Sequence, residues 1–597
     1  MENFAHGACS DFKGCTLSCH KQSHGEKVIA VARQIDCVPL ALVHLRSVFI
    51  TYWQPLFLFV VTLVAAGVFC RMGVDPHHDG IMLKPAFDVA DGKMLFRDSY
   101  CQYGALTSIL QGWAVLIFGH YLLVIKILTA FFYACGAALL WFNWVKIMPA
   151  WLAWLSGLLW LSMAPFLITP ELPWSSVYAI PFQLISTLWI MRFIDKNHQR
   201  FVFASGIAAG LVFWCRQPVG VVHLAALIII LATFGTLHLI EWKKSLQALV
   251  VLLAGEASTF LVFMSWLVIN GALRDWWKQS IKFSVIFGME YFGRPTPGHL
   301  FRVLFPYPNI TFRPRPNYQL YDPCYMWDLL PLASFALLGL ILWRLVIRHS
   351  KEKRDAMLFV YLIVALGSWH QYYPLSDAVH AFWAAGMMVG ILSVLFWELA
   401  PIRRRFPRPV IVIMALALCF WPYLRPRVPL IACHYNAHSV PFETPVVLKG
   451  MLSSPEEVAN LSSFSKSVDV YLENHPNAGM IDATEDALYI TFRDDRALCF
   501  HPAYVKWAVL QHRLYLDYQK ALLDCIERER PLAVVTLTPD LKGFDSGVKD
   551  GVPVVWNGEE TFSGYGVWQR FERGITLIAP ASCKYSPLAT DGCELQF

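Results

Sequence analysis

The sequence predicts an α-helical polytopic membrane protein with a small soluble α/β domain at its C-terminal end. Its 597 residues are 56% hydrophobic and only 15% charged, with a mean hydropathy of +0.46. Soluble domains carry roughly a quarter charged residues, so a soluble protein of this size is excluded. Apolar runs recur from Ser47 to Leu424 between short polar breaks, and the composition changes after that point.

The aromatic content also fits a chain that crosses the membrane many times. It has 23 Trp, 23 Tyr and 41 Phe, and Trp and Tyr concentrate where helices meet the membrane surface. The net charge of +6 is small for this length, and the basic residues form no blocks interleaved with aromatics. The sequence therefore gives no sign of nucleic-acid binding.

Residues 1–46 precede the first apolar run and are predicted to form a cytoplasmic tail. That run is long enough to cross a bilayer and begins far from the terminus, unlike the apolar part of a cleavable signal peptide. The tail is rich in cysteine and histidine, which invites a zinc site, but it contains no C-x-x-C pair. A mobile, reduced tail is therefore favoured. Its cysteines are Cys9, Cys15, Cys19 and Cys37.

Residues 47–425 are predicted to form a transmembrane domain of about eleven helices. The breaks between apolar runs alternate between basic breaks and breaks of mixed chemistry, and basic breaks face the cytoplasm. This alternation puts the N-terminus in the cytoplasm and the C-terminal domain outside it. The basic clusters are Lys196 with Arg200, Lys243-Lys244, Arg344 to Arg354 and Arg403 to Arg405.

Two long outer loops are expected, at residues 74–119 and 270–326. The region Tyr103–Val145 is long enough for two spans, but two spans would invert every later basic cluster. We therefore expect Gly104–Phe118 to be a helix in or re-entering the outer leaflet, so that only about Tyr121–Trp144 crosses. The second loop is basic on balance; it either gates a substrate or binds anionic headgroups.

Residues 426–597 are predicted to form the extracytoplasmic soluble domain. Strands are expected at Ala478–Ile481 and Leu532–Leu537, and a helix from about Tyr504 to Glu529. Alternating helix and strand indicates a small α/β module.

The most informative segment is Asp75–Asp98, which follows directly on the first apolar run. Acids and histidines beside a membrane span are costly unless a site uses them. Asp79 suits a general base that activates an acceptor hydroxyl, and Asp75, His77 and Asp79 together suit a divalent cation. The alternative is a solvated loop whose acids cap short helices, as Asp88 or Asp98 would.

The same segment resembles the first outer loop of bacterial GT-C-fold glycosyltransferases, the relatives of protein mannosyltransferases and aminoarabinose transferases. The resemblance rests on His78-Asp79-Gly80, Ala90-Asp91-Gly92, Phe96-Arg97-Asp98, Tyr103-Gly104 and Phe118-Gly119. It implies a polytopic enzyme of the bacterial inner membrane that transfers sugar from a polyprenyl-phosphate carrier to an acceptor on the outer face. An acid at the start of this loop is the base in such enzymes, and here it matches Asp79.

One departure from that family concerns the residue before the acid. Many members carry an Asp-Glu pair at the loop start, whereas this chain has His78-Asp79-Gly80. A divalent metal is therefore one expectation, and a histidine that carries protons in place of one acid is the other.

Three further breaks at outer span ends carry candidate binding residues. Arg216, followed by Gln217 and Pro218, either faces the carrier phosphate or is an anchor at the interface. Glu171 either orients the acceptor or a metal, or belongs to an ordinary turn between two prolines. Similar enzymes carry a Tyr-Tyr-Pro-x-Ser-Asp-x-x-His run like the one here, whose alternative is a belt of interface aromatics. The candidates in that run are His370, Tyr373, Asp377 and His380.

The leading hypothesis is an inverting membrane glycosyltransferase, a hexosyl- or pentosyltransferase, with Asp79 as general base. His78, Asp98 and Tyr103 are expected to bind substrate with the residues of the other breaks. The partners expected are the polyprenyl-phosphate sugar donor, an acceptor lipid, glycan or protein, and the bilayer. The alternative from another class is a transporter or flippase of lipid-linked saccharides, which would more often show internal repeats and ionisable residues at the membrane midplane.

Overall fold

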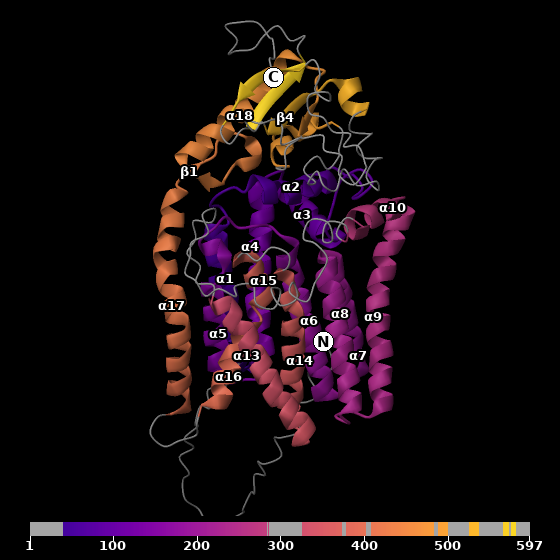
Figure 1. Ribbon diagram of the computed structural model, residues 1–597, viewed down its shortest axis with the longest axis vertical. Coiled ribbons are helices and arrows are strands. Elements are labelled where there is room, and N and C mark those ends of the chain that lie inside the picture. Colours follow the sequence, from indigo (N-terminus) through magenta and orange to yellow (C-terminus); the bar gives the residue numbers. More distant parts are fainter. Residues whose placement is uncertain are drawn as a thin grey trace, which may run out of the picture. The chain divides into compact units, whose positions relative to one another are not determined.

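The computed structural model describes residues 40–282, 285, 325–372, 378–400, 407–482, 487–498, 524–536, 565–571 and 575–580 (Figure 1). The chain divides into two compact units, Met1–Tyr52 and Trp53–Phe597. Of the first unit, only the start of helix α1 (Leu40–Phe69) is described. The cysteine-rich tail and most of the expected loop at 270–326 lie outside the described residues. Everything below concerns the second unit.

Six of the described helices are long and apolar enough to cross a membrane, and one pair of helices bent by 53° is a seventh candidate. The six are α4 (Leu122–Trp144), α6 (Ser175–Lys196), α8 (Gln217–Thr236), α9 (Trp242–Ile269), α13 (Tyr325–Leu342) with its π-helical continuation η4 (Trp343–Ile347), and α17 (Arg408–Ala437). The bent pair is α15 (Ala378–Ala385) with α16 (Met388–Leu399). A helical membrane protein is thereby confirmed.

The expected number of about eleven spans would need shorter helices to cross as well. Apart from α1, these are α5 (Ala150–Ser162), α7 (Gln199–Cys215) and α14 (Lys353–Ser368). The remaining short elements of this part are η2 (Pro165–Leu167), α10 (Leu273–Trp276), η3 (Trp277–Lys282) and η5 (Trp369–Tyr372).

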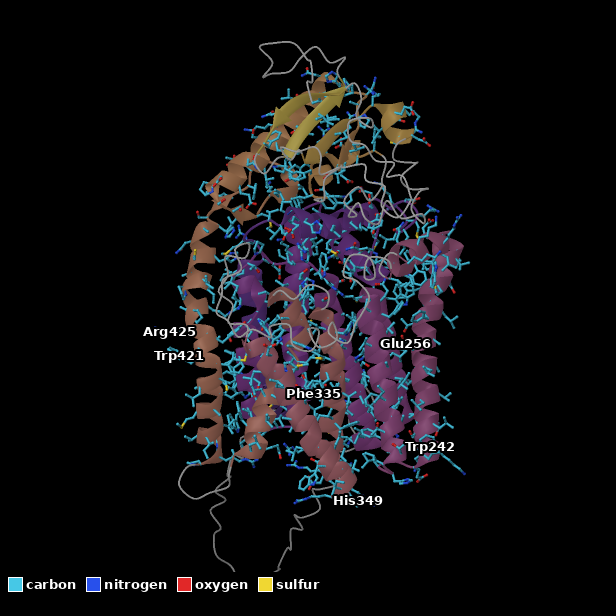
Figure 2. The ribbon with its side chains drawn as sticks, viewed as in Figure 1. Trp242, Glu256, Phe335, His349, Trp421 and Arg425 are labelled. Carbon is cyan, nitrogen blue, oxygen red and sulfur yellow. The ribbon has the colours of Figure 1, made fainter. Side chains whose placement is uncertain are left out.

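The outward faces of the long helices are apolar. Figure 2 shows Trp421 on α17 and Trp242 at the start of α9, and both side chains are more than half exposed. Leu261 and Val262 on α9 and Leu418 on α17 are equally open. A helix that is apolar on its exposed face as well as its buried one has lipid as its solvent, which explains why this sequence forms spans.

Two helices approach each other unusually closely because glycines line their contact. Helices α7 and α9 lie side by side (Figure 1). A Cβ on Gly206 would lie 2.2 Å from the carbonyl oxygen of Leu252, and one on Gly255 would lie 2.3 Å from that of Phe203. Only glycine allows this separation. The contact fixes the course of α7, which ends directly before Arg216.

The outer loop after α1 folds into helices α2 (Pro76–Ala90) and α3 (Ala105–Phe118). They pack tightly, since a Cβ on Gly112 of α3 would lie 2.4 Å from Val89 Cγ1 of α2. The helix expected at 104–118 is therefore confirmed as a helix. Its last turn exposes Leu116, Ile117 and Phe118, which fits the expectation that it meets the outer leaflet.

Beyond the long helix α17 the chain changes to strands and short helices. Helix α17 itself continues to Ala437, past the domain start expected at residue 426. A short antiparallel pair, β1 (Val440–Pro441) with β2 (Leu452–Ser453), is followed by a four-stranded sheet of order β3-β4-β6-β5. Strand β3 runs parallel to β4, and the other neighbours are antiparallel.

The small α/β part is confirmed in its elements. The strands expected at 478–481 and 532–537 appear as β3 and β4, and residues 524–529 of the expected helix at 504–529 are helical. Residues 504–523 of that helix lie outside the described residues. The elements are β3 (Met480–Asp482), β4 (Leu532–Thr536), β5 (Tyr565–Arg570), β6 (Ile575–Pro580), η6 (Val446–Leu448), α18 (Pro455–Asn474) and η7 (Tyr489–Arg496).

Candidate active site

Helix α2 begins with charged groups that cap it. Asp75 is the N-cap residue: its Oδ1 accepts the N–H of His78 at 2.9 Å, and its Oδ2 lies 2.9 Å from His78 Nδ1. Pro76 takes the first helical position, where a missing N–H costs no helical bond. Asp79 lies one turn further on, and its Oδ2 accepts the N–H of Asp75 at 2.9 Å. The local sequence thus turns the Asp79 carboxylate toward the start of the helix.

A lysine from a membrane helix holds the same carboxylate oxygen. Lys126 Nζ lies 3.0 Å from Asp79 Oδ2 and 3.3 Å from the carbonyl oxygen of Gly73, and both charged side chains are fully buried. Asp79 Oδ1 has no hydrogen-bond partner in the described part of the chain. The sequence reasoning missed Lys126. Its signal was that it is the only charged residue in α4, and a buried ammonium in a span needs a partner.

A second carboxyl group lies close to this pair. Glu171 is fully buried, and neither of its oxygens has a hydrogen-bond partner among the described residues. Burial raises the pKa of Glu171 well above its ordinary value; the charge of Lys126 opposes this rise, and the charge of Asp79 adds to it. An unpartnered buried carboxyl is costly, so the turn interpretation alone does not account for Glu171.

A row of ring contacts leads from the start of α2 to Arg216. The His78 ring lies 4.9 Å from the Trp174 ring, which lies 4.9 Å from the Tyr103 ring. The guanidinium carbon of Arg216 stands 5.5 Å from the centre of the Tyr103 ring. Candidates from two separate breaks, His78 and Tyr103 of the first and Arg216 of a later one, are therefore joined through Trp174, which the sequence reasoning did not single out.

Arg216 lies where α7 ends and α8 begins, and it is partly buried. Its Nη1 donates to Ser176 Oγ at 2.6 Å. Burial lowers the pKa of Arg216, and Tyr103 opposes this effect. Arginine keeps its charge under such conditions because its ordinary pKa is so high. The site thus holds a guanidinium in contact with neutral groups only, among the described residues.

Two neighbours of Arg216 carry unused hydrogen-bonding groups. Gln217 is buried, and its Nε2 has no partner among the described residues. His370 Nδ1 lies 2.7 Å from the carbonyl oxygen of Gly367, while its Nε2 has no partner in the same part of the chain. Burial, together with the charge of Arg216, lowers the pKa of His370 to about 4. The ring is therefore neutral at physiological pH.

The acids at the start of α2 have opposite pKa shifts. Burial raises the pKa of Asp79 to about 6, although Lys126 pulls it down. Burial also acts upward on Asp75, but its bonds to His78 and the charge of that ring outweigh burial and bring its pKa to about 2. Asp75 is therefore a permanent anion, whereas Asp79 titrates near neutral pH, as a general base must.

Of the other candidates from the sequence, Asp98 has a local role in a turn. Asp98 is bonded to its neighbour Arg97 at 2.8 and 2.6 Å and accepts the N–H of Met94 at 3.0 Å, which is the local role of an acid that closes a turn. His380 is buried in α15 with its ring 5.1 Å from that of Trp383. Tyr373 and Asp377 lie outside the described residues.

The proposed metal ligands are engaged elsewhere. Asp75 caps α2, the His77 ring packs against that of His78 at 5.0 Å, and Asp79 is paired with Lys126. In the described ranges, no group of three His, Cys, Asp or Glu side chains is arranged to hold a metal ion. As they stand in the described ranges, Asp75, His77 and Asp79 are thus not arranged as a metal site, because Lys126 pairs with Asp79; a divalent metal stays a prediction.

Comparison with known proteins gives a likeness of fold. No family model and no curated protein matches the chain. Among similar solved structures, the oligosaccharyltransferase of Archaeoglobus fulgidus tethered with an acceptor peptide containing the NVT sequon has a TM-score of 0.50 and 13% identity, over 89% of this chain and 74% of that chain. The same archaeal enzyme in complex with Zn and sulfate has a TM-score of 0.46 and 14% identity, over 88% and 73%.

A bacterial structure belongs to the same set. ArnT from Cupriavidus metallidurans, bound to undecaprenyl phosphate, has a TM-score of 0.47 and 11% identity, over 88% of this chain and 97% of that chain. The expected fold is confirmed by the first of these structures: this chain has the fold of the archaeal oligosaccharyltransferase.

Proposed function

We propose that the protein is a membrane glycosyltransferase that moves a sugar from a polyprenyl-phosphate carrier to an acceptor on the extracytoplasmic face. The observation that carries this proposal is the state of Asp79. Its carboxylate is buried, one oxygen is held by Lys126, the other has no partner among the described residues, and its pKa is about 6. These are the properties of a general base that works near neutral pH.

The transfer would be a single displacement. The acceptor hydroxyl hydrogen-bonds to Asp79 Oδ1, and its proton passes to that oxygen as the hydroxyl oxygen attacks the anomeric carbon. The bond between the anomeric carbon and the phosphate oxygen breaks, and its electron pair leaves with the polyprenyl phosphate. Attack from the face opposite the phosphate inverts the anomeric centre. Lys126 keeps Asp79 ionised until the proton arrives.

The leaving phosphate would be held by Arg216. Its guanidinium presents planar, charged donors that match a phosphate bidentately, and it is held by Ser176 and Tyr103 at one end of the aromatic row. His370 would hydrogen-bond to the sugar. With Nδ1 donating to Gly367, Nε2 of the neutral ring accepts, for example from a sugar hydroxyl. Glu171, with its raised pKa, would orient the acceptor hydroxyl.

The proposed arrangement in the membrane follows the sequence. The tail of 1–46 would be cytoplasmic, 47–425 would form the transmembrane catalytic domain, and 426–597 would lie outside, in bacteria on the outer side of the inner membrane. Cys525 of the C-terminal part is disulfide-bonded, and disulfides persist in oxidising compartments. Free cysteines such as Cys70, Cys101 and Cys215 lie in the helical part instead.

A transporter or flippase of lipid-linked saccharides remains the second candidate. The placement of the charged groups favours the enzyme, because Asp79, Glu171 and Arg216 lie at the ends of spans rather than in their middle. The two candidates differ in chemistry, so one substitution separates them.

Asp79→Asn keeps the shape of the side chain but removes the base. We expect sugar transfer in membranes carrying a polyprenyl-phosphate sugar to fall by roughly 10²–10⁴-fold. The thermal unfolding midpoint should also fall, because the buried ammonium of Lys126 loses its partner, so transfer is compared at equal amounts of folded protein. Asp91→Asn in the same loop is the matched control, since Asp91 is exposed and contacts only His120 among the described contacts. Transfer at the wild-type rate by Asp79→Asn would show that Asp79 is not the base. A wild-type protein that moves lipid-linked saccharides across the membrane but transfers no sugar would favour the transporter.

A further inference from the structure

The C-terminal part hydrogen-bonds to residues 71–73, the segment just before helix α2, in what we call the first grip. Leu452 of β2 accepts the N–H of Gly73 at 2.8 Å and donates to the carbonyl oxygen of Arg71 at 2.6 Å. Arg71 Nε also donates to the carbonyl oxygen of Gly450 at 3.0 Å. Met72 thus forms an isolated parallel bridge with Leu452 of β2. Lys126 Nζ donates to the carbonyl oxygen of the same Gly73. Gly73 therefore contacts both the C-terminal part and the lysine of the charged pair.

The second contact with the C-terminal part, the second grip, is the close approach of its backbone to Gly80, the residue after Asp79. A Cβ on Gly80 would lie 2.1 Å from the backbone nitrogen of Leu488 and 2.4 Å from the carbonyl carbon of Ala487. These are backbone atoms, which cannot move aside as a flexible side chain would. Glycine at position 80 is therefore required for the C-terminal part to reach α2, which gives the His-Asp-Gly sequence a physical reason.

A third grip lies one helical turn further along the same face. Lys84 of α2 is buried, with its Nζ 3.0 Å from Asp494 Oδ1 of η7 and 2.5 Å from Asp88 Oδ1. Asp88 is fully buried and also binds Lys93 Nζ at 2.7 Å and Ser99 Oγ at 2.6 Å. Because residues 80 and 84 are four apart, they present one face of α2 to the C-terminal part.

We propose that residues 487–496 of the C-terminal part are a positioning element of the catalytic centre, with Gly80 and Asp494 as positioning residues for Asp79. This inference rests on the proposed function and deepens it. Asp79 lies between the first grip at residues 71–73 and the second and third at 80 and 84. The 3.0 Å separation of Asp79 from Lys126 therefore depends on where the C-terminal part holds α2.

A shift of α2 would change the ionisation of Asp79 as well as the rate of sugar transfer. Lys126 lowers the pKa of Asp79 against the effect of burial, and a wider separation weakens that effect. A loosened α2 therefore raises the pKa of Asp79, and the acidic limb of the pH–rate profile moves to higher pH. Mere destabilisation lowers the amount of folded enzyme and leaves the limb where it was.

The first test is Asp494→Asn in the full-length protein, with Asp495→Asn as matched control. Asp495 is the next residue and contacts Arg493 and Arg496 rather than α2. In Asp494→Asn we expect amide hydrogen exchange across residues 79–90 to be about tenfold faster, because the ion pair between Lys84 and Asp494 is lost. We expect the acidic limb of the pH–rate profile for sugar transfer to move to higher pH by roughly half a pH unit to one pH unit. The control should change neither.

The second test is Gly80→Ala, with Gly67→Ala as control because a Cβ there meets nothing within 4 Å. We expect Gly80→Ala to speed exchange in α2 and to move the limb in the same direction as Asp494→Asn. Hydrogen exchange needs no activity, so it still reports the grip if the wild-type protein transfers no sugar and the proposed function fails. Unchanged exchange in α2 for both variants, or faster exchange with an unmoved limb, would overturn the positioning role.

Discussion

At the scale of single residues, the protonation of Asp79 is a balance between burial and one ammonium group. Burial raises its pKa, and Lys126 is the largest opposing influence. The free oxygen, Oδ1, is the one that would take a proton, since Oδ2 already accepts two hydrogen bonds. Wild-type transfer should therefore fall with decreasing pH through about 6, because a protonated carboxyl cannot act as base.

Removing Lys126 tests this balance directly. In Lys126→Met the carboxyl of Asp79 loses its partner, so its pKa rises and the group takes up a proton rather than remain a buried, unpaired anion. We expect the acidic limb of the pH–rate profile to move upward by at least about one unit, with the largest loss of rate below pH 7. Lys449→Met, at an exposed position, is the control. An unmoved limb in Lys126→Met would mean that Asp79 is not the titrating base.

At the scale of elements, the close packing of α7 and α9 determines where Arg216 lies. Helix α7 ends at Cys215, and Gly206 lies in its middle against the backbone of α9. Any side chain at position 206 must push the two helices apart. The end of α7 would then shift, and with it the contacts of Arg216 to Ser176 and Tyr103.

Gly206→Ala should therefore affect both stability and donor binding. Overpacking of this kind costs about 1–3 kcal/mol, which thermal unfolding in detergent would register as a lower midpoint. We also expect a higher KM for the lipid-linked donor. Gly339→Ala is the matched control, because it lies in another apolar helix and a Cβ there meets nothing within 4 Å. Equal midpoints for the two variants would contradict the proposed role of the glycine contact.

At the scale of the whole molecule, the sequence predicted the membrane fold, the helix before Gly119 and the strands β3 and β4, because each depends on a local pattern of apolar residues. It could not predict which distant groups meet. Lys126 is 47 positions from Asp79 in the sequence, and only the packing of α4 against the outer loop joins them. The metal expectation came from local spacing alone, which cannot show that an ammonium group occupies the place beside the acid. The grip of residues 487–496 on α2 is equally invisible locally.

The proposed orientation of the whole chain can be tested without any assumption about its reaction. Glu473 near the end of α18 and His349 in the basic break after η4 are both exposed. Basic breaks face the cytoplasm, so Glu473 should lie outside and His349 inside. In a variant with all 15 native cysteines replaced by serine, an impermeant thiol reagent should label Glu473→Cys in intact cells and His349→Cys only after permeabilisation. Labelling in the reverse order would place Asp79 and the C-terminal part on the cytoplasmic side, where an extracytoplasmic acceptor could not reach them.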